Sequence, residues 1–235
     1  IQANTTAGFS IVTTTNTVRS AAYMTIPHGL GTTPHCIIAK QYASSNIWAI
    51  YHQIIPSNSL MLGGAYGDDV MNSGTNFANV GGTTFQVQSN SISGSTDENH
   101  IFYCFAGIEG YSKFGSYTTN AVADGPFVYT GFRPAFVMVK VASGSSNSAY
   151  WSWAMYDNKR VTINPNHSFL FANLTMAEPG RGDGSTTTGG DGVYFDFYSN
   201  GFKDRSGATE TNGAAGDIIV YMAFAEAPFK YANAR

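Results

Sequence analysis

Aromatic side chains are the residues of this sequence best suited to bind a ligand. Rings that reach one exposed face can stack on flat apolar surfaces such as those of sugars. The aromatics in segments of strand character are Trp48, Tyr51, Trp151, Trp153, Tyr156, Tyr194, Phe195, Phe197 and Tyr198. Trp153 is matched by Trp48 in an earlier part of the chain, which favours a core role for both. Tyr150 and Trp151 have no such counterpart, so we predict that these two residues bind a ligand.

A segment rich in Gly, Ser and Thr carries the other candidate binding residues, Arg181, Asp183 and Asp191. Its oxygen atoms and flexible glycines are suited to calcium, but their spacing matches no defined calcium-binding loop. We therefore expect a surface loop and no cofactor, with calcium binding as the alternative. Arg181-Gly182-Asp183 also resembles the integrin-recognition tripeptide, which is too short to support a function.

Residues for catalysis or metal binding are not grouped along the chain. His28 and His35 flank a Gly-Leu-Gly turn but match no metal-ligand spacing, so we expect structural roles for both. Adjacent acids such as Asp68-Asp69 point to opposite faces on a strand and do not converge. No Gly-x-Ser-x-Gly motif of a nucleophile elbow occurs. We expect a non-enzymatic protein without a metal site.

Cys36 and Cys104 are the only cysteines, and each lies in an apolar segment. Phe136 and Met222 take their places in the second half of the chain, where a structural disulfide would not normally be replaced by large apolar residues. Because cysteine packs well as a small hydrophobe, we predict two buried free thiols. A disulfide is the alternative.

The elements that position these residues are duplicated. Gly31-Thr32-Thr33-Pro34 returns as Gly131-Phe132-Arg133-Pro134. The matches that follow in the same order are Trp48–Tyr51 with Trp153–Tyr156, Phe85–Asn90 with Phe195–Asn200, and Tyr103–Ala106 with Tyr221–Ala225. The extra residue in the last match predicts a β-bulge at Ala223, unless the alignment slips there. The repeat predicts a duplicated unit of about a hundred residues, enough for a small domain.

Short runs rich in Tyr, Phe, Val, Ile and Thr alternate with turn sequences, as is typical of all-β proteins. The expected strands are Ser10–Thr15, Cys36–Ala39, Ile47–His52, Thr84–Val87, Ile101–Phe105, Phe136–Val141, Tyr150–Tyr156, Val193–Tyr198 and Ile218–Phe224. The predicted fold class is all-β, with two tandem, internally duplicated β-sandwich (jelly-roll-like) domains. The expected parts are an N-terminal linker at 1–7, sandwiches at 8–111 and 112–229, and a C-terminal tail at 230–235.

Composition excludes several classes of partner. Charged residues make up 11% of the chain, against roughly 25% in an average globular protein. The net charge is -3 and the basic residues are scattered, so no basic groove for nucleic acid is expected. Apolar runs are far shorter than a membrane span, so we expect no membrane partner. No charged-then-apolar signal sequence opens the chain. Because the first residue is Ile1 and not an initiator methionine, we expect a fragment or a processed product.

Several long motifs carry a resemblance to a known family. They are Gly8–Val12, His28–Pro34, Tyr111–Tyr117, Asp124–Pro134, Ser199–Lys203 and Tyr221–Lys230. The chain resembles a poorly characterised duplicated β domain found near the C-termini of tail and tail-fibre virion proteins of aquatic bacteriophages. The resemblance spans nearly the whole chain and brings no catalytic residues. It implies a location in the virion, in a phage tail or appendage.

Resemblance and composition together suggest a non-enzymatic structural module of a bacteriophage tail fibre or spike that attaches to the host surface. The expected partners are other virion proteins, host-surface glycan and further copies of the chain, with a trimer expected for a fibre. Many weak contacts to glycan would add up across the copies. The alternatives are a purely structural spacer or decoration module and a polysaccharide depolymerase domain.

Overall fold

The computed structural model describes most of the chain, in segments. The described residues are 1–17, 23–42, 48–55, 59–62, 70–71, 77–88, 98–143, 152–175, 178, 195–207 and 209–227. They divide into two compact units, with the change between Ile108 and Glu109. We name the earlier residues unit 1 and the later ones unit 2, and describe each by itself. Within the described segments, no helix has the length and apolar character needed to cross a membrane.

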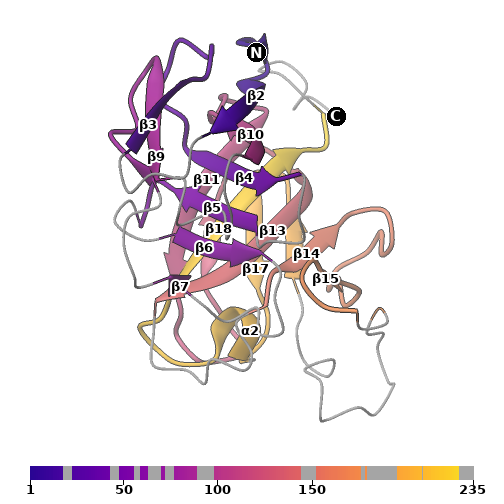
Figure 1. Ribbon diagram of the computed structural model, residues 1–235. Helices are drawn as coiled ribbons and strands as arrows, with labels where there is room; N and C mark the ends of the chain where they lie inside the picture. The colour runs from indigo at the N-terminus through magenta and orange to yellow at the C-terminus, as the bar shows by residue number, and fades with distance from the viewer. Residues whose placement is uncertain are drawn as a thin grey trace. The chain divides into compact units, whose positions relative to one another are not determined.

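Unit 1 consists of two antiparallel sheets. Its strands are β1 (Gln2–Asn4), β2 (Phe9–Thr17), β3 (Tyr23–Pro27), β4 (Cys36–Gln41), β5 (Trp48–His52), β6 (Ser59–Leu62), β7 (Val70–Met71), β8 (Phe77–Ala78), β9 (Thr84–Gln88) and β10 (Glu98–Phe105). The large sheet has the order β1-β2-β10-β4-β5-β6-β7, and the small sheet has the order β3-β9-β8. Figure 1 shows β4, β5 and β6 as neighbouring strands of the large sheet. Buried side chains from both sheets meet in one core, as in a β-sandwich.

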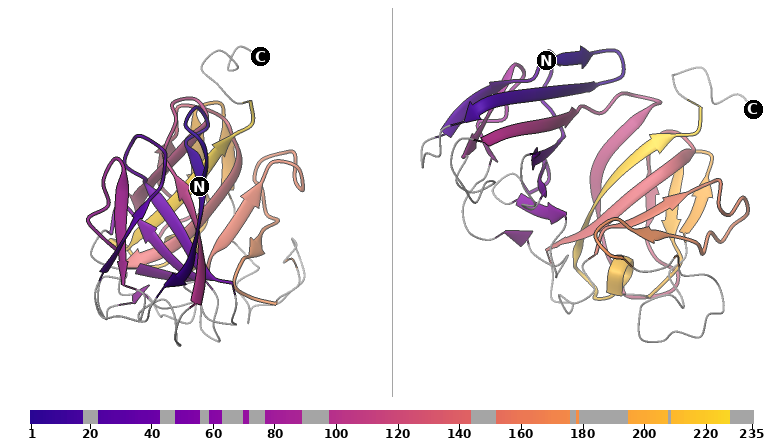
Figure 2. Two further views of the ribbon diagram at one scale, coloured as in Figure 1. Left: turned by 45° about the horizontal axis from the view of Figure 1, so that its top comes forward. Right: turned by 45° about the vertical axis from the view of Figure 1, so that its right-hand side comes forward.

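Unit 2 repeats this arrangement. Its elements are β11 (Ser112–Thr118), β12 (Phe127–Tyr129), β13 (Pro134–Ser143), β14 (Ala154–Asp157), β15 (Leu170–Phe171), β16 (Phe195–Tyr198), β17 (Gly201–Asp204), the single helical turn α2 (Thr209–Asn212) and β18 (Ile218–Ala225). The large sheet has the order β11-β18-β13-β14-β15, and the small sheet has the order β12-β17-β16. Figure 2 shows β18 (yellow) between β11 and β13. The all-β prediction is confirmed.

The two units match strand by strand. The order β2-β10-β4-β5-β6 of unit 1 corresponds to β11-β18-β13-β14-β15 of unit 2, and β3-β9-β8 corresponds to β12-β17-β16. The predicted internal duplication is therefore confirmed. Unit 1 has two additional edge strands, β1 and β7. Strand β1 lies within the segment expected to be a linker over residues 1–7, and it pairs with β2.

The strand register corrects two of the sequence matches. Phe105 lies opposite Cys36 as Phe224 lies opposite Phe136, so the counterpart of Cys104 is Ala223 and not Met222. Pairing is continuous through Ala223, so the predicted bulge there is wrong and the alignment slips instead. The sheet order also makes β17, not β16, the counterpart of β9. Neighbouring strands share the same period of two, so their short sequences are easily exchanged in an alignment.

The core of unit 2 is built from aromatic rings. Tyr156 stacks on Phe195 with ring centres 4.2 Å apart, and Phe195 stacks on Phe202 at 5.3 Å. Tyr221 meets Phe202 edge to face at 5.5 Å. Tyr156 and Tyr221 belong to the large sheet, whereas Phe195 and Phe202 belong to the small sheet. The rings therefore join the two layers, and each such pair adds about 1 kcal/mol beyond the area that it buries.

A pair formed by a lysine and a tryptophan is also repeated in the two units. Trp153, predicted to be a core residue, is fully buried, and the ammonium of Lys140 lies 5.9 Å from its ring centre. In unit 1 the ammonium of Lys40 lies 5.9 Å from the ring centre of Trp48, which is half-buried. Both pairs fall within the range of a cation–π interaction.

His28 and His35 have the structural roles expected of them. Nε2 of His28 lies 3.0 Å from the carbonyl oxygen of Gly81, and its Nδ1 accepts a hydrogen bond from the Leu30 amide at 3.3 Å. Nδ1 of His35 accepts from the Gly107 amide at 2.8 Å. Burial lowers the pKa of both imidazoles, because it disfavours the charged form.

Cys36 and Cys104 are buried free thiols, as predicted. Cys104 belongs to the core between the two sheets of unit 1. Cys104 lies opposite Ile37 and shares a face of the sheet with it. Cys36 directly precedes Ile37 on β4, so it points to the other face of the same sheet. Burial raises the pKa of both thiols, that of Cys104 to about 12.

We expect these thiols to be unreactive in the native protein, because the thiolate is the reactive form and burial disfavours it. Titration with Ellman's reagent at mildly alkaline pH should detect neither cysteine before unfolding and both afterwards. Fast reaction of either thiol in the folded protein would contradict the described burial.

Candidate functional site

The binding residues predicted from the sequence lie outside the described residues. These are Tyr150, Trp151, Arg181, Asp183 and Asp191. Their role in binding therefore stays a prediction, and so does the alternative of calcium binding in the segment around Arg181. The candidate site below is built from other residues, all of them in unit 2.

Most of the aromatics expected on strands are structural. Trp153, Tyr156, Phe195 and Phe197 are buried in unit 2, as is Tyr51 in unit 1. Trp48 is half-buried and stacks against Tyr103, with ring centres 6.5 Å apart. Tyr194 lies outside the described residues. Tyr198 is exposed, and it lies on β16 in the small sheet of unit 2.

The small sheet of unit 2 has an apolar inner face and an aromatic and charged outer face. On β12, β17 and β16 the residues that face the core are Val128, Phe202, Phe195 and Phe197. The alternate positions point outward. The register places Phe127, Lys203 and Asp196 in one row across the strands, and Tyr129, Gly201 and Tyr198 in the next. We name these outward side chains, Phe127, Tyr129, Asp196, Tyr198 and Lys203, the aromatic face.

Three rings of this face remain accessible to solvent. Phe127, Tyr129 and Tyr198 are 48%, 60% and 37% exposed. The ring of Phe127 meets that of Tyr198 edge to face, with centres 5.8 Å apart. Exposed aromatics that lie together, unlike single exposed ones, are typical of a binding surface.

Gly201 makes this arrangement possible. A Cβ at this position would lie 2.9 Å from Cζ of Phe127 and would clash with the carbonyl oxygen of Val128. Only glycine therefore lets the Phe127 ring lie over β17.

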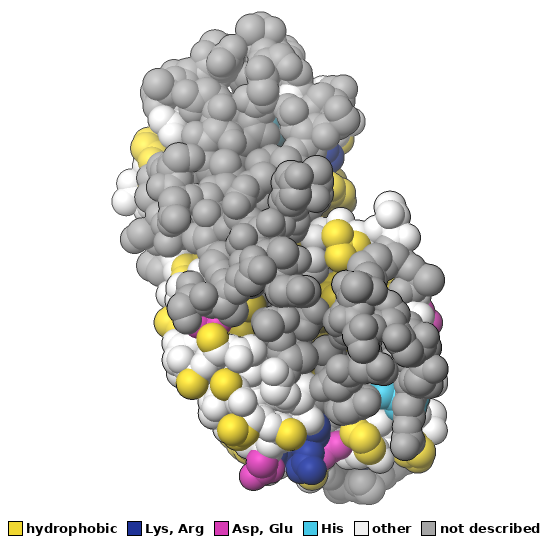
Figure 3. All heavy atoms as spheres, turned by 90° about the horizontal axis from the view of Figure 1, so that it is seen from below, with side chains coloured by type: hydrophobic (Ala, Val, Ile, Leu, Met, Phe, Trp, Pro, Cys, Tyr) yellow, Lys and Arg dark blue, Asp and Glu magenta, His cyan; other side chains and the backbone are white. Residues whose placement is uncertain are grey.

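Charged groups surround the three rings. Nζ of Lys203 lies 2.6 Å from Asp124, and Arg205 lies 3.7 Å from both Asp124 and Asp196. The hydroxyl of Tyr198 donates to Oδ2 of Asp196 at 3.0 Å. The hydrogen bond from Lys203 lowers the pKa of Asp124, and the bond to Asp196 raises the pKa of Tyr198. Figure 3, which views the molecule from below, shows basic and acidic side chains next to one another with hydrophobic side chains around them.

An open cavity of about 340 Å³ lies beside this face. The described residues that line it are Asn164, Pro165, Asp196 and Arg205. The side chain of Asn164 is held against β16, because its Nδ2 donates to the Phe197 carbonyl and its Oδ1 accepts from the Phe197 amide, each at 3.0 Å. This wall of the cavity is thus anchored to the sheet.

A buried asparagine organises the loop beside the aromatic face. Oδ1 of Asn212 accepts from the amides of Asn120 and Ala121, at 2.8 and 3.1 Å. Its Nδ2 lies within hydrogen-bonding distance of Asn120 Oδ1, the Val122 carbonyl and the Ser206 carbonyl. Asn212 therefore ties the loop that leads to Asp124 to the residue that follows Arg205.

Asp204 is a buried acid at the end of β17. Its Oδ1 accepts from the amide and the hydroxyl of Ser206, at 2.9 and 2.7 Å. Its Oδ2 has no partner at hydrogen-bonding distance among the described residues, and the nearby Tyr117 hydroxyl donates instead to the Thr211 carbonyl at 3.0 Å. Burial raises the pKa of Asp204 to about 6, although the surrounding Ser206, Thr211 and Tyr117 hydroxyls favour the charged form.

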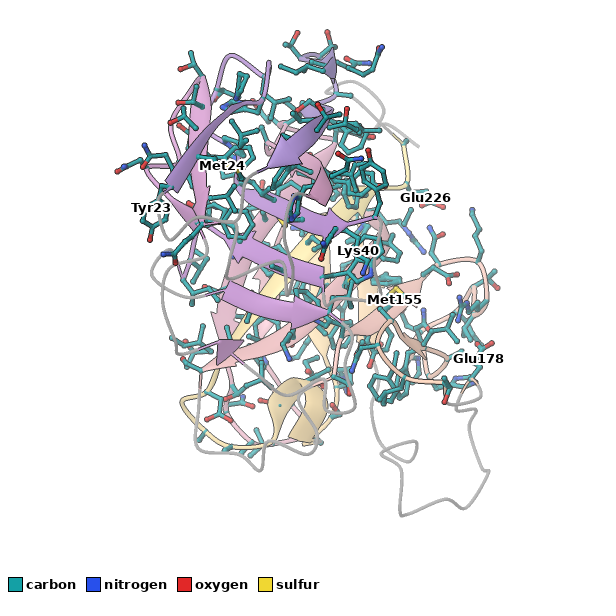
Figure 4. All side chains as sticks on the ribbon, in the orientation of Figure 1. Tyr23, Met24, Lys40, Met155, Glu178 and Glu226 are labelled. Carbon is teal, nitrogen blue, oxygen red and sulfur yellow. The ribbon has the colours of Figure 1, made fainter. Side chains whose placement is uncertain are left out.

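The same sheet in unit 1 provides an internal comparison. Corresponding positions in unit 2 and unit 1 carry Phe127 and Thr25, Tyr129 and Pro27, Asp196 and Ala78, Lys203 and Gln86, and Asp204 and Val87. No charged residue occurs on β3, β8 or β9. The exposed ring there is Tyr23, which Figure 4 shows pointing away from the sheet, on the opposite side from Met24. The inward residues of the two small sheets are therefore alike except at Asp204, whereas the outward residues differ.

Sequence reasoning identified Tyr198 but missed Phe127, Tyr129, Lys203 and Arg205. The sequence does contain a signal for a strand at this place, because aromatic and aliphatic side chains alternate in Phe127-Val128-Tyr129. The pairing of β12 with β17, which brings these residues beside Tyr198, depends on tertiary structure.

These features define a tandem β-sandwich protein whose second sandwich presents an aromatic and charged face. The chain belongs to the family described as a domain of unknown function (DUF7483), whose model matches residues 1–228. No curated protein and no solved structure matches it. Among the described side chains, no group of three or more His, Cys, Asp or Glu residues is placed to hold a metal ion.

We expect Asp204→Asn to change how stability depends on pH. Because the pKa of Asp204 rises from 3.8 to about 6 on folding, the native chain holds a proton between about pH 4 and pH 6 that the unfolded chain releases. The contribution of Asp204 to stability therefore falls as pH rises through this window, by about 3 kcal/mol. Asparagine does not titrate, so as pH rises through this window the free energy of unfolding of the variant should increase by this amount relative to that of the parent protein.

Chemical denaturation of both proteins across this range measures the difference. His28 and His35, whose pKa values are lowered by burial, act with the opposite sign but are present in both proteins and cancel. A stability difference that stays constant with pH would show that Asp204 is charged in the native state throughout.

Proposed function

We propose that the chain is a non-enzymatic carbohydrate-binding module that contacts glycan through the aromatic face of unit 2. The observation that carries the proposal is the group of three exposed rings, Phe127, Tyr129 and Tyr198, bordered by charged side chains and an open cavity. Aromatic rings supply flat apolar area at a low entropic cost, and the charged groups supply hydrogen bonds that orient a polar ligand.

The difference between the two units supports this proposal. The packing residues largely recur in both units, so they serve the fold, whereas among the described residues of the two small sheets the group of three exposed rings and the charged side chains occur in unit 2. Gly201 is required for the position of the Phe127 ring, and Asp196 lines the cavity. Packing of the core explains none of these outward features.

The biological setting that we propose is the virion of a bacteriophage, in a tail fibre or spike that attaches to the host surface. The support is the resemblance of the motifs to virion appendage proteins, and the partners would be other virion proteins, host-surface glycan and further copies of the chain. One stacking contact is weak, but linking several copies can raise the overall affinity by about 10²–10⁴. A trimeric fibre would supply such copies.

A glycan array probed with the recombinant protein tests the binding function. We expect Tyr198→Ala to reduce the affinity for a bound glycan by roughly fivefold, because an aromatic contact contributes about 1 kcal/mol. Tyr23→Ala is the matched control, since Tyr23 is exposed on the corresponding sheet of unit 1, whose strands β3, β8 and β9 carry no charged residue. It should leave the affinity unchanged.

The remaining outcomes separate the alternatives. An array without binding, together with virions that fail to assemble when the chain is deleted, would favour a purely structural spacer or decoration module. New reducing ends after incubation with host capsule or lipopolysaccharide would favour a depolymerase. Equal losses in Tyr198→Ala and Tyr23→Ala would place the binding surface elsewhere.

A further inference from the structure

We infer that the cavity beside Tyr198 binds one neutral, hydroxyl-rich sugar unit and recognises two adjacent hydroxyl groups through Asp196 and Arg205. This inference rests on the proposed glycan binding and names the class of glycan. The observations that carry it are the hydrogen-bonding state of the two side chains and the balance of charge around the cavity.

Asp196 supplies an oriented acceptor. Its side chain is only 12% exposed, and the Tyr198 hydroxyl holds Oδ2 by a hydrogen bond of 3.0 Å. No described residue donates a hydrogen bond to Oδ1 of Asp196, although the residue lines the cavity. A carboxylate held in this way is preorganised to accept a hydrogen bond from a ligand hydroxyl.

Arg205 supplies the donor. Arg205 lies 3.7 Å from both Asp124 and Asp196, which is an ion-pair distance and too long for a hydrogen bond. The carboxylates therefore hold the guanidinium near the cavity without using its N–H groups in short bonds. A ligand oxygen next to the hydroxyl bound by Asp196 can accept from Arg205, so a pair of neighbouring hydroxyls matches both side chains.

The local charge selects against acidic sugars. Among the described side chains that form ion pairs beside the cavity, two carboxylates, Asp124 and Asp196, balance two cations, Lys203 and Arg205. A sugar carboxylate bound by Arg205 would lie close to Asp196 and be repelled, whereas a sugar cation would meet the guanidinium. A neutral ring avoids both penalties.

The size of the site favours a single sugar ring. At about 340 Å³ the cavity is at the lower end of the range of ligand pockets, roughly 300–1,000 Å³. Tyr198 is both an exposed ring and the hydrogen-bond partner of Asp196, so it connects the cavity to the aromatic face. A sugar in the cavity can therefore continue into a second unit that stacks on the exposed rings.

The corresponding positions of unit 1 lack this chemistry. Ala78 stands where unit 2 has Asp196, and Gln86 stands where it has Lys203. We therefore assign one such sugar site to each chain.

Calorimetric titration of the whole chain with neutral and acidic trisaccharides tests the assignment. The neutral probes are maltotriose, cellotriose and mannotriose, and the acidic probe is trigalacturonic acid, all at low ionic strength. We expect binding of at least one neutral probe with one site per chain and weaker or no binding of the acidic probe.

Asp196→Asn and Arg205→Lys test the two recognition groups. Asparagine keeps the shape of Asp196 but removes the charged acceptor, and lysine keeps the charge of Arg205 but removes the planar set of donors. Each should weaken binding of the neutral probe about tenfold, while Asp196→Asn should improve binding of trigalacturonic acid. Tyr23→Ala should change neither, and thermal unfolding confirms that each variant is folded.

The outcomes distinguish this inference from the proposed function. Tighter binding of trigalacturonic acid than of the neutral probes, or neutral binding unaffected by both variants, would overturn the neutral-sugar site and leave glycan binding standing. Failure of every probe here, together with failure of the glycan array, would overturn the proposed function itself.

Discussion

The packing of aromatic rings between the two sheets of unit 2 is the interaction on which the rest of the candidate site depends. Tyr156 and Tyr221 from the large sheet hold Phe195 and Phe202 from the small sheet, with ring centres 4.2 to 5.5 Å apart. Because successive side chains on a strand point to opposite faces, burying Phe195 and Phe202 forces their neighbours outward. Asp196 and Lys203 lie on the outer face of the small sheet for that reason.

Polar groups at one end of the sandwich add a second constraint. Asn212 is buried, and its amide is hydrogen-bonded to both the loop that leads to Asp124 and the segment after Arg205. A buried amide is favourable only when its hydrogen bonds are satisfied, so this loop has little freedom to move away. Asp204 is an exception to this rule, because it is buried and its Oδ2 has no hydrogen-bond partner among the described residues. Unit 1 has Val87 at the corresponding position. Burial of Asp204 weakens the fold at neutral pH, which indicates that the residue is not there for stability alone.

The duplication allows structural and functional residues to be separated within one chain. All the strands expected from the sequence are present where the chain is described, because runs of β-branched and aromatic residues between turn sequences are a strong local signal. Other strands were missed, among them β12 and β17 of the aromatic face, where three or four residues give too little periodicity to recognise. The sequence comparison matched β9 with β16 and not with its true counterpart β17 for the same reason, because these strands are short. The predicted binding residues Tyr150, Trp151, Arg181, Asp183 and Asp191 lie outside the described residues, so the site described here rests on different side chains.

The sequence by itself determined the all-β class, the duplication, the burial of Trp153 and the two free thiols, because each depends on local pattern or on comparison of the two copies. Only the tertiary structure decided that Phe127, Tyr129, Asp196, Tyr198 and Lys203 form one face. These residues are separated by some seventy positions in the chain, and pairing across strands brings them together. Strand register is a property of the whole sheet and its core, so no local stretch of sequence contains it.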